Sequence, residues 1–226
     1  MTALNAMITE DTIVISMDML VSKLNSVGEL VPAYFTQKFE YMPFAKSVIC
    51  GTGNYNIIQK AIESSRSILA KDVDTFTTFT SEFLITLNKS KYKITDTNTT
   101  TVYIFGFDED GNTRGYALRS TNDFSPDLIA GSDNPSMIFK PDLSSVPGFS
   151  EDMGLVLNET DDIKKFIQMM RVEKKYDDQL TTGKVGIGGE NILLIIGDNA
   201  NTAAIQKIDV FDDYDEQYEY ALENLN

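Results

Sequence analysis

Hydrophobic residues recur along the chain with two different periods, and the shorter period predicts paired strands. Between Ile8 and Leu20, β-branched and apolar residues surround a polar turn, which predicts a hairpin at the start of the chain. Thr99 to Phe107 and Thr113 to Arg119 flank an acidic turn that contains Gly111, and they predict a second hairpin. Further strands are expected over residues 39–41, 46–50, 191–196 and 203–211.

The longer period predicts three amphipathic helices. Apolar residues at helical spacing favour a helix from Asn54 to Leu69, which follows the strand end at Gly51-Thr52-Gly53. A second helix is expected from a cap at Asp74 or Thr75 to about Asn88. The third covers residues 161–176, with Ile163, Phe166, Ile167 and Met170 on its apolar face. Residues 22–35 and 120–156 are interpreted as loose or irregular surface.

The order of these elements indicates the fold class. Strands cluster separately from helices, which is typical of antiparallel sheets covered by helices and argues against a doubly wound parallel sheet. No repeat or linker divides the 226 residues, so we expect one α+β domain over residues 1–226. The last 15 residues, 212–226, are acidic and rich in tyrosine, and they are expected to form an acidic C-terminal tail or a weak helix.

Composition excludes several function classes. The chain has no histidine and one cysteine, which excludes the usual zinc sites, histidine-based triads and internal disulfides. A formal net charge of −15 argues against binding to a nucleic-acid backbone. We interpret the acidity as a solvated surface, and a nucleic-acid mimic as the alternative. No apolar run is long enough for a membrane span and no secretory signal is recognised, so we expect a cytoplasmic protein.

Two short motifs resemble ligand-binding loops. The turn at residues 108–112 resembles a calcium loop in its acidic residues, but it lacks the later glutamate and lies between strands. The glycines between Gly183 and Gly189 surround Lys184 but miss the phosphate-loop pattern. Neither motif predicts a metal ion or a cofactor.

Several residues together resemble the proteasome β-subunit and its bacterial relative, the HslV peptidase, as a divergent bacterial or viral member of that family. Asp18 lies at the family's separation from Thr2, and Lys38 precedes the glycine-bearing strand. The remaining matches are Gly51 and Gly53 in the glycine turn, Ser132 in Leu128-Ile129-Ala130-Gly131-Ser132, and Asp178 with Thr181 ahead of Thr182-Gly183. Threonine replaces the family's serine at position 181, and an extra glycine-rich stretch follows it.

The resemblance implies a four-layer αββα sandwich of two antiparallel sheets flanked by helices, the fold of N-terminal nucleophile hydrolases. It implies that Thr2, exposed by removal of Met1, is a nucleophile whose own α-amine takes the hydroxyl proton. Lys38 and Asp18 are then expected to keep that amine neutral. A backbone amide at Gly51 or Gly53 would supply the oxyanion donor, and Ser132 would move protons or hold a water.

Three functions follow from these patterns as hypotheses. The first is a threonine peptidase that cuts peptides or unfolded proteins inside a ring-like homo-oligomer. The second is an inactive descendant of the fold that serves as a structural or assembly protein, for example in a virus, in which Asp18 and Lys38 form only a structural salt bridge. The third is an acidic decoy that mimics nucleic acid. Removal or retention of Met1 separates the first two.

Overall fold

The computed structural model describes residues 2–90, 99–197 and 199–224, and Met1 and the last two residues of the expected tail lie outside these ranges. The described strands are β1 Leu4–Ile8, β2 Thr12–Asp18, β3 Leu20–Leu24, β4 Leu30–Phe35, β5 Phe39–Met42, β6 Ser47–Gly53, β7 Thr100–Phe107, β8 Thr113–Arg119, β9 Pro126–Gly131, β10 Ser136–Lys140, β11 Glu190–Gly197 and β12 Thr202–Val210. The described α-helices are α1 Tyr55–Ser65, α2 Val73–Lys89, α3 Phe149–Leu157, α4 Asp162–Asp177 and α5 Tyr214–Glu223.

Within the described residues, the strands form two five-stranded sheets and one two-stranded hairpin, all antiparallel. The first sheet has the order β10-β1-β2-β11-β12, the second has the order β5-β6-β7-β8-β9, and β3 pairs with β4. In the first sheet, Leu4 lies opposite Met17, and Asp18 lies opposite Asn191. This register brings the start of β1 next to the end of β2, so the N-terminal residues lie beside Asp18.

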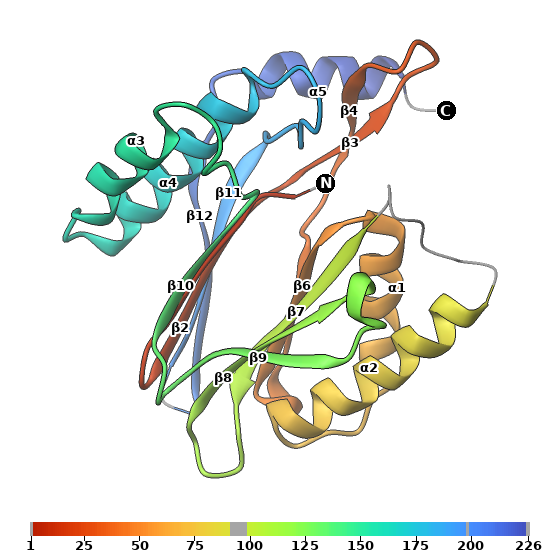
Figure 1. The fold of residues 1–226 in the computed structure, drawn as a ribbon, viewed down its shortest axis with the longest axis vertical. Coiled ribbons are helices and arrows are strands. Elements are labelled where there is room, and N and C mark those ends of the chain that lie inside the picture. Colours follow the sequence, from red (N-terminus) through yellow and green to blue (C-terminus); the bar gives the residue numbers. More distant parts are fainter. Residues whose placement is uncertain (1, 91–98, 198, 225–226) are drawn as a thin grey trace.

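The two large sheets face each other, and helices cover their outer faces (Figure 1). Alternating residues of β1 and β2, such as Leu4 and Ile15, meet Phe105 and Cys50 of the second sheet in one buried cluster. Burial of each such large side chain contributes roughly 1.5–3 kcal/mol. A second cluster joins the other face of β6 and β7 to α1 and α2, and Phe166 of α4 packs on the outer face of β2 and β11.

These observations confirm the mixed class of helices and antiparallel sheets, and the hairpins at residues 4–18 and 100–119. Local bounds differ from the predictions. Helix α1 ends at Ser65, and α2 begins one turn earlier than expected, because Asp72 is its cap and accepts a hydrogen bond from the Thr75 amide at 2.7 Å. On α4, Ile163 is exposed, and the buried face continues instead to Glu173 and Asp177.

The largest difference concerns the two segments interpreted as irregular. Residues 120–156 contain β9, β10 and α3, and residues 20–35 form the hairpin β3–β4. The strands β9 and β10 are edge strands of their sheets and carry few fully buried residues, so their sequences show no clear hydrophobic alternation. Their pairing depends on long-range register, which local pattern does not report.

The hairpin β3–β4 projects beyond the sheets, and α5 lies against it (Figure 1). The ring of Phe35 packs edge-on against Tyr214 at a centroid distance of 5.3 Å and also contacts Tyr218. Residues 214–223 of the expected tail are therefore a helix packed on the fold. Among the described residues, no helix combines the length and apolar character that a membrane crossing requires.

Candidate active site

Thr2 lies just before β1, in a pocket that strands of both large sheets and three connecting segments line. The pocket has a volume of about 170 Å³. Its lining residues are Thr2, Thr52, Gly53, Thr99, Thr101, Lys140, Pro141 and Val185. The Thr2 hydroxyl oxygen is buried and has no hydrogen-bond partner among the described residues. Leaving a buried hydroxyl unpaired costs about 1–3 kcal/mol, so such a group calls for an explanation.

Asp18 and Lys38 form a buried ion pair directly behind Thr2. Lys38 Nζ lies 2.9 Å from Asp18 Oδ1 and donates a second hydrogen bond, of 2.5 Å, to the carbonyl of Leu20. The same Asp18 oxygen accepts the Ala3 amide at 2.8 Å, and its other oxygen accepts the Gly188 amide at 3.3 Å. Asp18 therefore ties the residue after Thr2 to Lys38.

The electrostatics of Lys38 follow from its complete burial. Desolvation lowers the pKa of Lys38, while the charge of Asp18 and the hydrogen bond to it act in the opposite direction. Both side chains are fully shielded from solvent. The pair thus places a cation close to the N-terminal residues at a position where water does not screen it.

The two glycines of the predicted glycine turn have different surroundings. Gly53 lines the Thr2 pocket and has a φ of +101°, and a Cβ there would lie 2.1 Å from the Thr99 carbonyl oxygen. Gly51 does not line the pocket; a Cβ at Gly51 would meet Ile58 of α1 and the Thr101 carbonyl at 2.8 Å. Gly53 is therefore the glycine that approaches Thr2, and Gly51 allows α1 to pack on β6.

The position of Gly53 gives a testable prediction. Replacing Gly53 by alanine is expected to lower the free energy of unfolding by at least about 1–3 kcal/mol, because the backbone is strained and the neighbouring carbonyl is in the way. Gly154→Ala in α3 is the control, because a Cβ there meets nothing within 4 Å, and it should raise stability by about 0.4–1 kcal/mol. Urea unfolding of both variants checks this, and equal stabilities would contradict it.

Ser132, Asp178 and Thr181 do not line the pocket that holds Thr2. The Ser132 hydroxyl accepts the Thr113 amide at 2.8 Å and donates to the Glu10 carbonyl at 3.0 Å. Glu10 lies in the turn between β1 and β2, at the opposite end of β1 from Thr2. The prediction for Ser132 chose the turn after β9, whereas the chain that returns beside the start of β1 is the end of β10, where Lys140 pairs with Leu4.

Asp178 and Thr181 also lie outside the pocket. Asp178 is partly exposed and pairs with Lys174 at 3.1 Å and Lys184 at 2.7 Å, and Thr181 is exposed. The preceding residue, Asp177, is the one that is fully buried, and it accepts the amides of Val185 and Gly186 at 2.7 and 2.8 Å. Asp177 thereby fixes the glycine-rich loop whose Val185 lines the Thr2 pocket.

Sequence reasoning missed the role of the buried acids on α4. Phe166, Met170, Glu173 and Asp177 recur at helical spacing, so extending the predicted apolar face would have placed both acids inside. Glu173 accepts a hydrogen bond of 2.9 Å from the Asn5 amide group, and its second oxygen has no partner among the described residues. Burial raises the pKa of Glu173 well above its usual range.

The charges around Glu173 act in the same direction as burial. Asp18 and Asp177 raise its pKa further, and only the hydrogen bond from Asn5 lowers it. The folded state therefore keeps a proton that the unfolded chain releases above a pH of about 4.3. The contribution of Glu173 to the free energy of unfolding is therefore complete below that pH. It falls as the pH rises toward the pKa of Glu173 in the folded protein.

Glu173→Gln should remove this pH dependence. Compared with the wild type, the variant is expected to gain stability as the pH rises above about 4.3, with a slope that approaches about 1.4 kcal/mol per pH unit. Glu82→Gln, at an exposed position of α2, should show no such trend. Denaturant unfolding between pH 4 and 8 measures both differences, and parallel curves for the wild type and Glu173→Gln would contradict the prediction.

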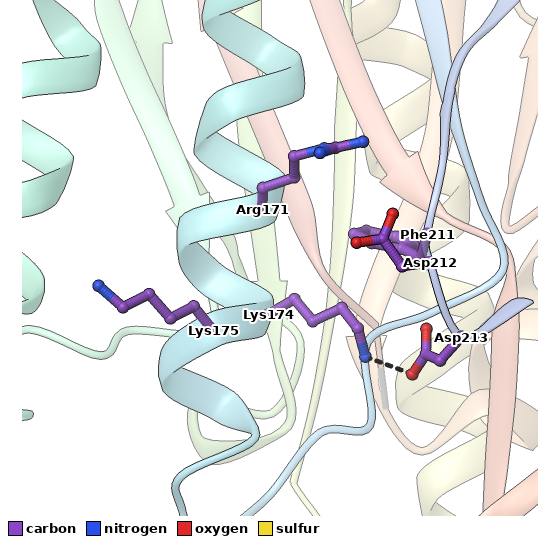
Figure 2. A pocket seen from close by; sticks show the side chains of 6 residues that line it. All are labelled: Arg171, Lys174, Lys175, Phe211, Asp212 and Asp213. Atoms are coloured by element: carbon purple, nitrogen blue, oxygen red, sulfur yellow. Dashed lines mark hydrogen bonds and ion pairs between the residues drawn. The ribbon is translucent and has the colours of Figure 1, made fainter.

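A second pocket lies between α4 and the segment that joins β12 to α5, and Figure 2 shows its side chains. Lys174 Nζ contacts Asp213 at 2.8 Å and the Ile187 carbonyl at 3.0 Å, and Arg171 binds Asp209 through two hydrogen bonds. Lys175 pairs with Asp152. Arg171 and Lys174 have acidic partners beyond β11, so these ion pairs connect α4 to the C-terminal segment. The pocket shares no lining residue with the Thr2 pocket. Among the described residues, no group of acidic, cysteine or histidine side chains is arranged to hold a metal ion.

Comparison with known proteins shows similarity in structure only. No family model matches the sequence, and no curated protein matches it either. A Gly-1 mutant of Anbu from Hyphomicrobium sp. strain MC1 matches with a TM-score of 0.62 and 10% identity, over 99% of this chain and 94% of that one. Anbu from Pseudomonas aeruginosa, solved as a helical assembly of the Anbu complex, gives a TM-score of 0.62 and 14% identity, over 98% and 93%.

A third structure, Anbu (ancestral beta-subunit) from Yersinia bercovieri, matches with a TM-score of 0.60 and 11% identity, over 98% of this chain and 92% of that one. Anbu is a family distinct from the proteasome β-subunit and HslV, so the family assignment made from the sequence was wrong. The spacing of the matching residues does not establish the family, because an edge strand can place a match such as Ser132 away from the start of β1. The chain therefore shares its fold with the Anbu proteins.

Proposed function

We propose that this protein is an N-terminal nucleophile hydrolase that cuts amide bonds of peptides with Thr2, after removal of Met1. The observation that carries the proposal is the buried Thr2 hydroxyl, which has no hydrogen-bond partner among the described residues and lies in a pocket beside Gly53. Under this proposal, residues 1–226 form a single domain whose layers are the αββα sandwich of this class. Under this proposal, the partners of the Thr2 hydroxyl are the carbonyl group of a substrate and the α-amine of Thr2 itself.

The reaction follows from one residue that holds both the nucleophile and the base. The Thr2 oxygen attacks the carbonyl carbon, and its proton passes to the α-amine of Thr2, directly or through water. The tetrahedral intermediate collapses, the C–N bond breaks, and the departing amine receives the proton. Water then hydrolyses the ester on Thr2, which releases the carboxylic acid and restores the hydroxyl.

The buried ion pair has two tasks in this scheme. The charge of Lys38 disfavours a second positive charge nearby, so it lowers the pKa of the Thr2 amine and keeps it neutral as a base. Asp18 keeps Lys38 charged and holds the Ala3 amide, and so fixes the backbone that carries Thr2. Gly53 supplies a backbone free of a side chain where the oxyanion would form.

We also propose that the chain self-associates. The Anbu structure from Pseudomonas aeruginosa is a helical assembly, and a hydrolase of this kind gains control over its substrates when its sites are enclosed by other copies. Light scattering on the purified protein measures this, and a mass equal to one chain of 25.2 kDa would contradict it.

The test of the proposed function combines the mass of the N-terminus with a peptidase assay. The mass should show that Met1 is absent, and the processed protein should hydrolyse fluorogenic peptides. Retained Met1 in the functional protein would overturn the proposal, because the amine would then belong to the wrong residue. That result would favour a structural protein, in which the Asp18–Lys38 pair only holds the residue before β5 to the end of β2.

A further inference from the structure

The pocket beside Thr2 contains a cation that the proposed chemistry does not use. Lys140 ends β10 and lies opposite Leu4 of β1, and directly paired residues place their side chains on the same face of a sheet. Leu4 belongs to the cluster between the two sheets. Lys140 is therefore aimed at the space between the sheets, at the end where Thr2 lies, and it lines the same pocket.

The charged side chain among the described lining residues of this pocket is a lysine, although the protein as a whole is strongly acidic. Its other polar side chains are the threonines Thr2, Thr52, Thr99 and Thr101, and no carboxylate of the described residues lines it. The whole chain carries 34 acidic residues against 19 basic ones, so a pocket with a lysine and no acid departs from the average surface. Hydroxyl groups and an ammonium group together are the donors that bind a carboxylate.

Among the residues that the structure describes, no acidic side chain lines the pocket beside Lys140. Asp142 is its acidic neighbour along the chain, and the pKa of Asp142 is lowered first by hydrogen bonds from Ser144 and only weakly by Lys140. In the part of the chain that the structure describes, Lys140 makes no ion pair of the kind seen for Lys174 or Lys184. Its charge is therefore available to a substrate.

We propose that Lys140 is a specificity residue that selects peptides with an aspartate or glutamate next to the scissile bond. The inference rests on the proposed function and names the substrate class of the same site. A carboxylate beside the ammonium group is attracted to it, whereas a leucine side chain is not. We expect a preference of about 10-fold in kcat/KM over leucine at the same position.

The experiment compares quenched fluorescent peptides that carry aspartate, leucine or lysine at one position flanking the scissile bond at a time. Wild-type protein should prefer aspartate, Lys140→Met should lose the preference, and Lys140→Glu should prefer lysine. Lys164→Glu is the matched control, because it changes the net charge equally at an exposed position on α4, and it should keep the wild-type preference. Raising the salt from 0.05 to 0.5 M should weaken the preference for aspartate in the wild type.

An electrophilic probe without charged groups separates failure of this inference from failure of the proposed function. Labelling of Thr2 together with equal cleavage of all three peptides, or with the same preference in Lys140→Glu, would overturn the role of Lys140 and leave the nucleophile in place. The absence of both labelling and cleavage would overturn the two proposals together. Reversal of the preference by Lys140→Glu, with none by Lys164→Glu, supports the inference.

Discussion

Lys38→Met is expected to lower the free energy of unfolding by about 3–5 kcal/mol, because it leaves the carboxylate of Asp18 buried without its counter-ion. Both side chains of the pair are fully shielded from solvent. Of its described donors, Asp18 would keep the amides of Ala3 and Gly188. Unfolding in urea, monitored by circular dichroism, measures the loss, and peptide hydrolysis should fall with it even where the variant remains folded.

Lys207→Met is the matched control for this prediction. Lys207 pairs with Glu190 at 2.9 Å, but its side chain is 52% exposed, so its loss should change stability by no more than about 1 kcal/mol. The double variant Asp18→Asn/Lys38→Met should be more stable than the sum of the single changes predicts, because it removes the unpaired charge. A loss for Lys38→Met as small as that for Lys207→Met would show that the pair contributes little.

Thr2→Ala is expected to reduce peptide hydrolysis by at least about 10³-fold, because it removes the nucleophile and leaves the pocket otherwise unchanged. Thr2→Ser keeps a hydroxyl on the same residue and should retain measurable activity. Stability should change little in both variants, since the hydroxyl has no hydrogen-bond partner to lose among the described residues. Fluorogenic peptide hydrolysis by proteins of verified N-terminal mass makes the comparison.

Thr181→Ala provides the control for Thr2→Ala. It also removes a threonine hydroxyl, but Thr181 is exposed and does not line the Thr2 pocket, so its activity should equal that of the wild type. A loss of activity in Thr181→Ala comparable with that of Thr2→Ala would restore the assignment of residues 178–181 that the geometry argues against. Equal activity of Thr2→Ala and wild type would exclude Thr2 as the nucleophile.

The sequence predicts that Asp18 lies beside Thr2, because the hairpin that joins them is visible in the local hydrophobic pattern. Residues 4–18 form a hairpin with a tight turn, so the residues before β1 lie next to Asp18 at the end of β2. Lys38 directly precedes β5, and the hairpin β3–β4 brings it back beside Asp18, with the Thr36 amide donating to the Met19 carbonyl. In each case, a hairpin of the intervening chain brings the two residues together.

The part that could not be predicted depends on pairing between distant segments. The edge strands β9 and β10 carry no hydrophobic alternation, so the sequence does not show which segment pairs with the start of β1. The sequence predicts Ser132 at that place, but Lys140 lies there. The choice between Asp177 and Asp178 depends on the rotation of α4 against the first sheet, because neighbouring side chains on a helix point about 100° apart. Glu173 was missed because an acid on a buried helix face contradicts the usual hydrophobic pattern.

The most direct measurement is peptide mapping by mass spectrometry after incubation of the protein with an electrophilic probe that reacts with N-terminal threonines. We predict a single adduct, on Thr2 as the first residue of the mature chain, and none in Thr2→Ala. An unmodified Thr2 that still follows Met1, under conditions in which a known N-terminal threonine hydrolase is fully labelled, would contradict the proposed function.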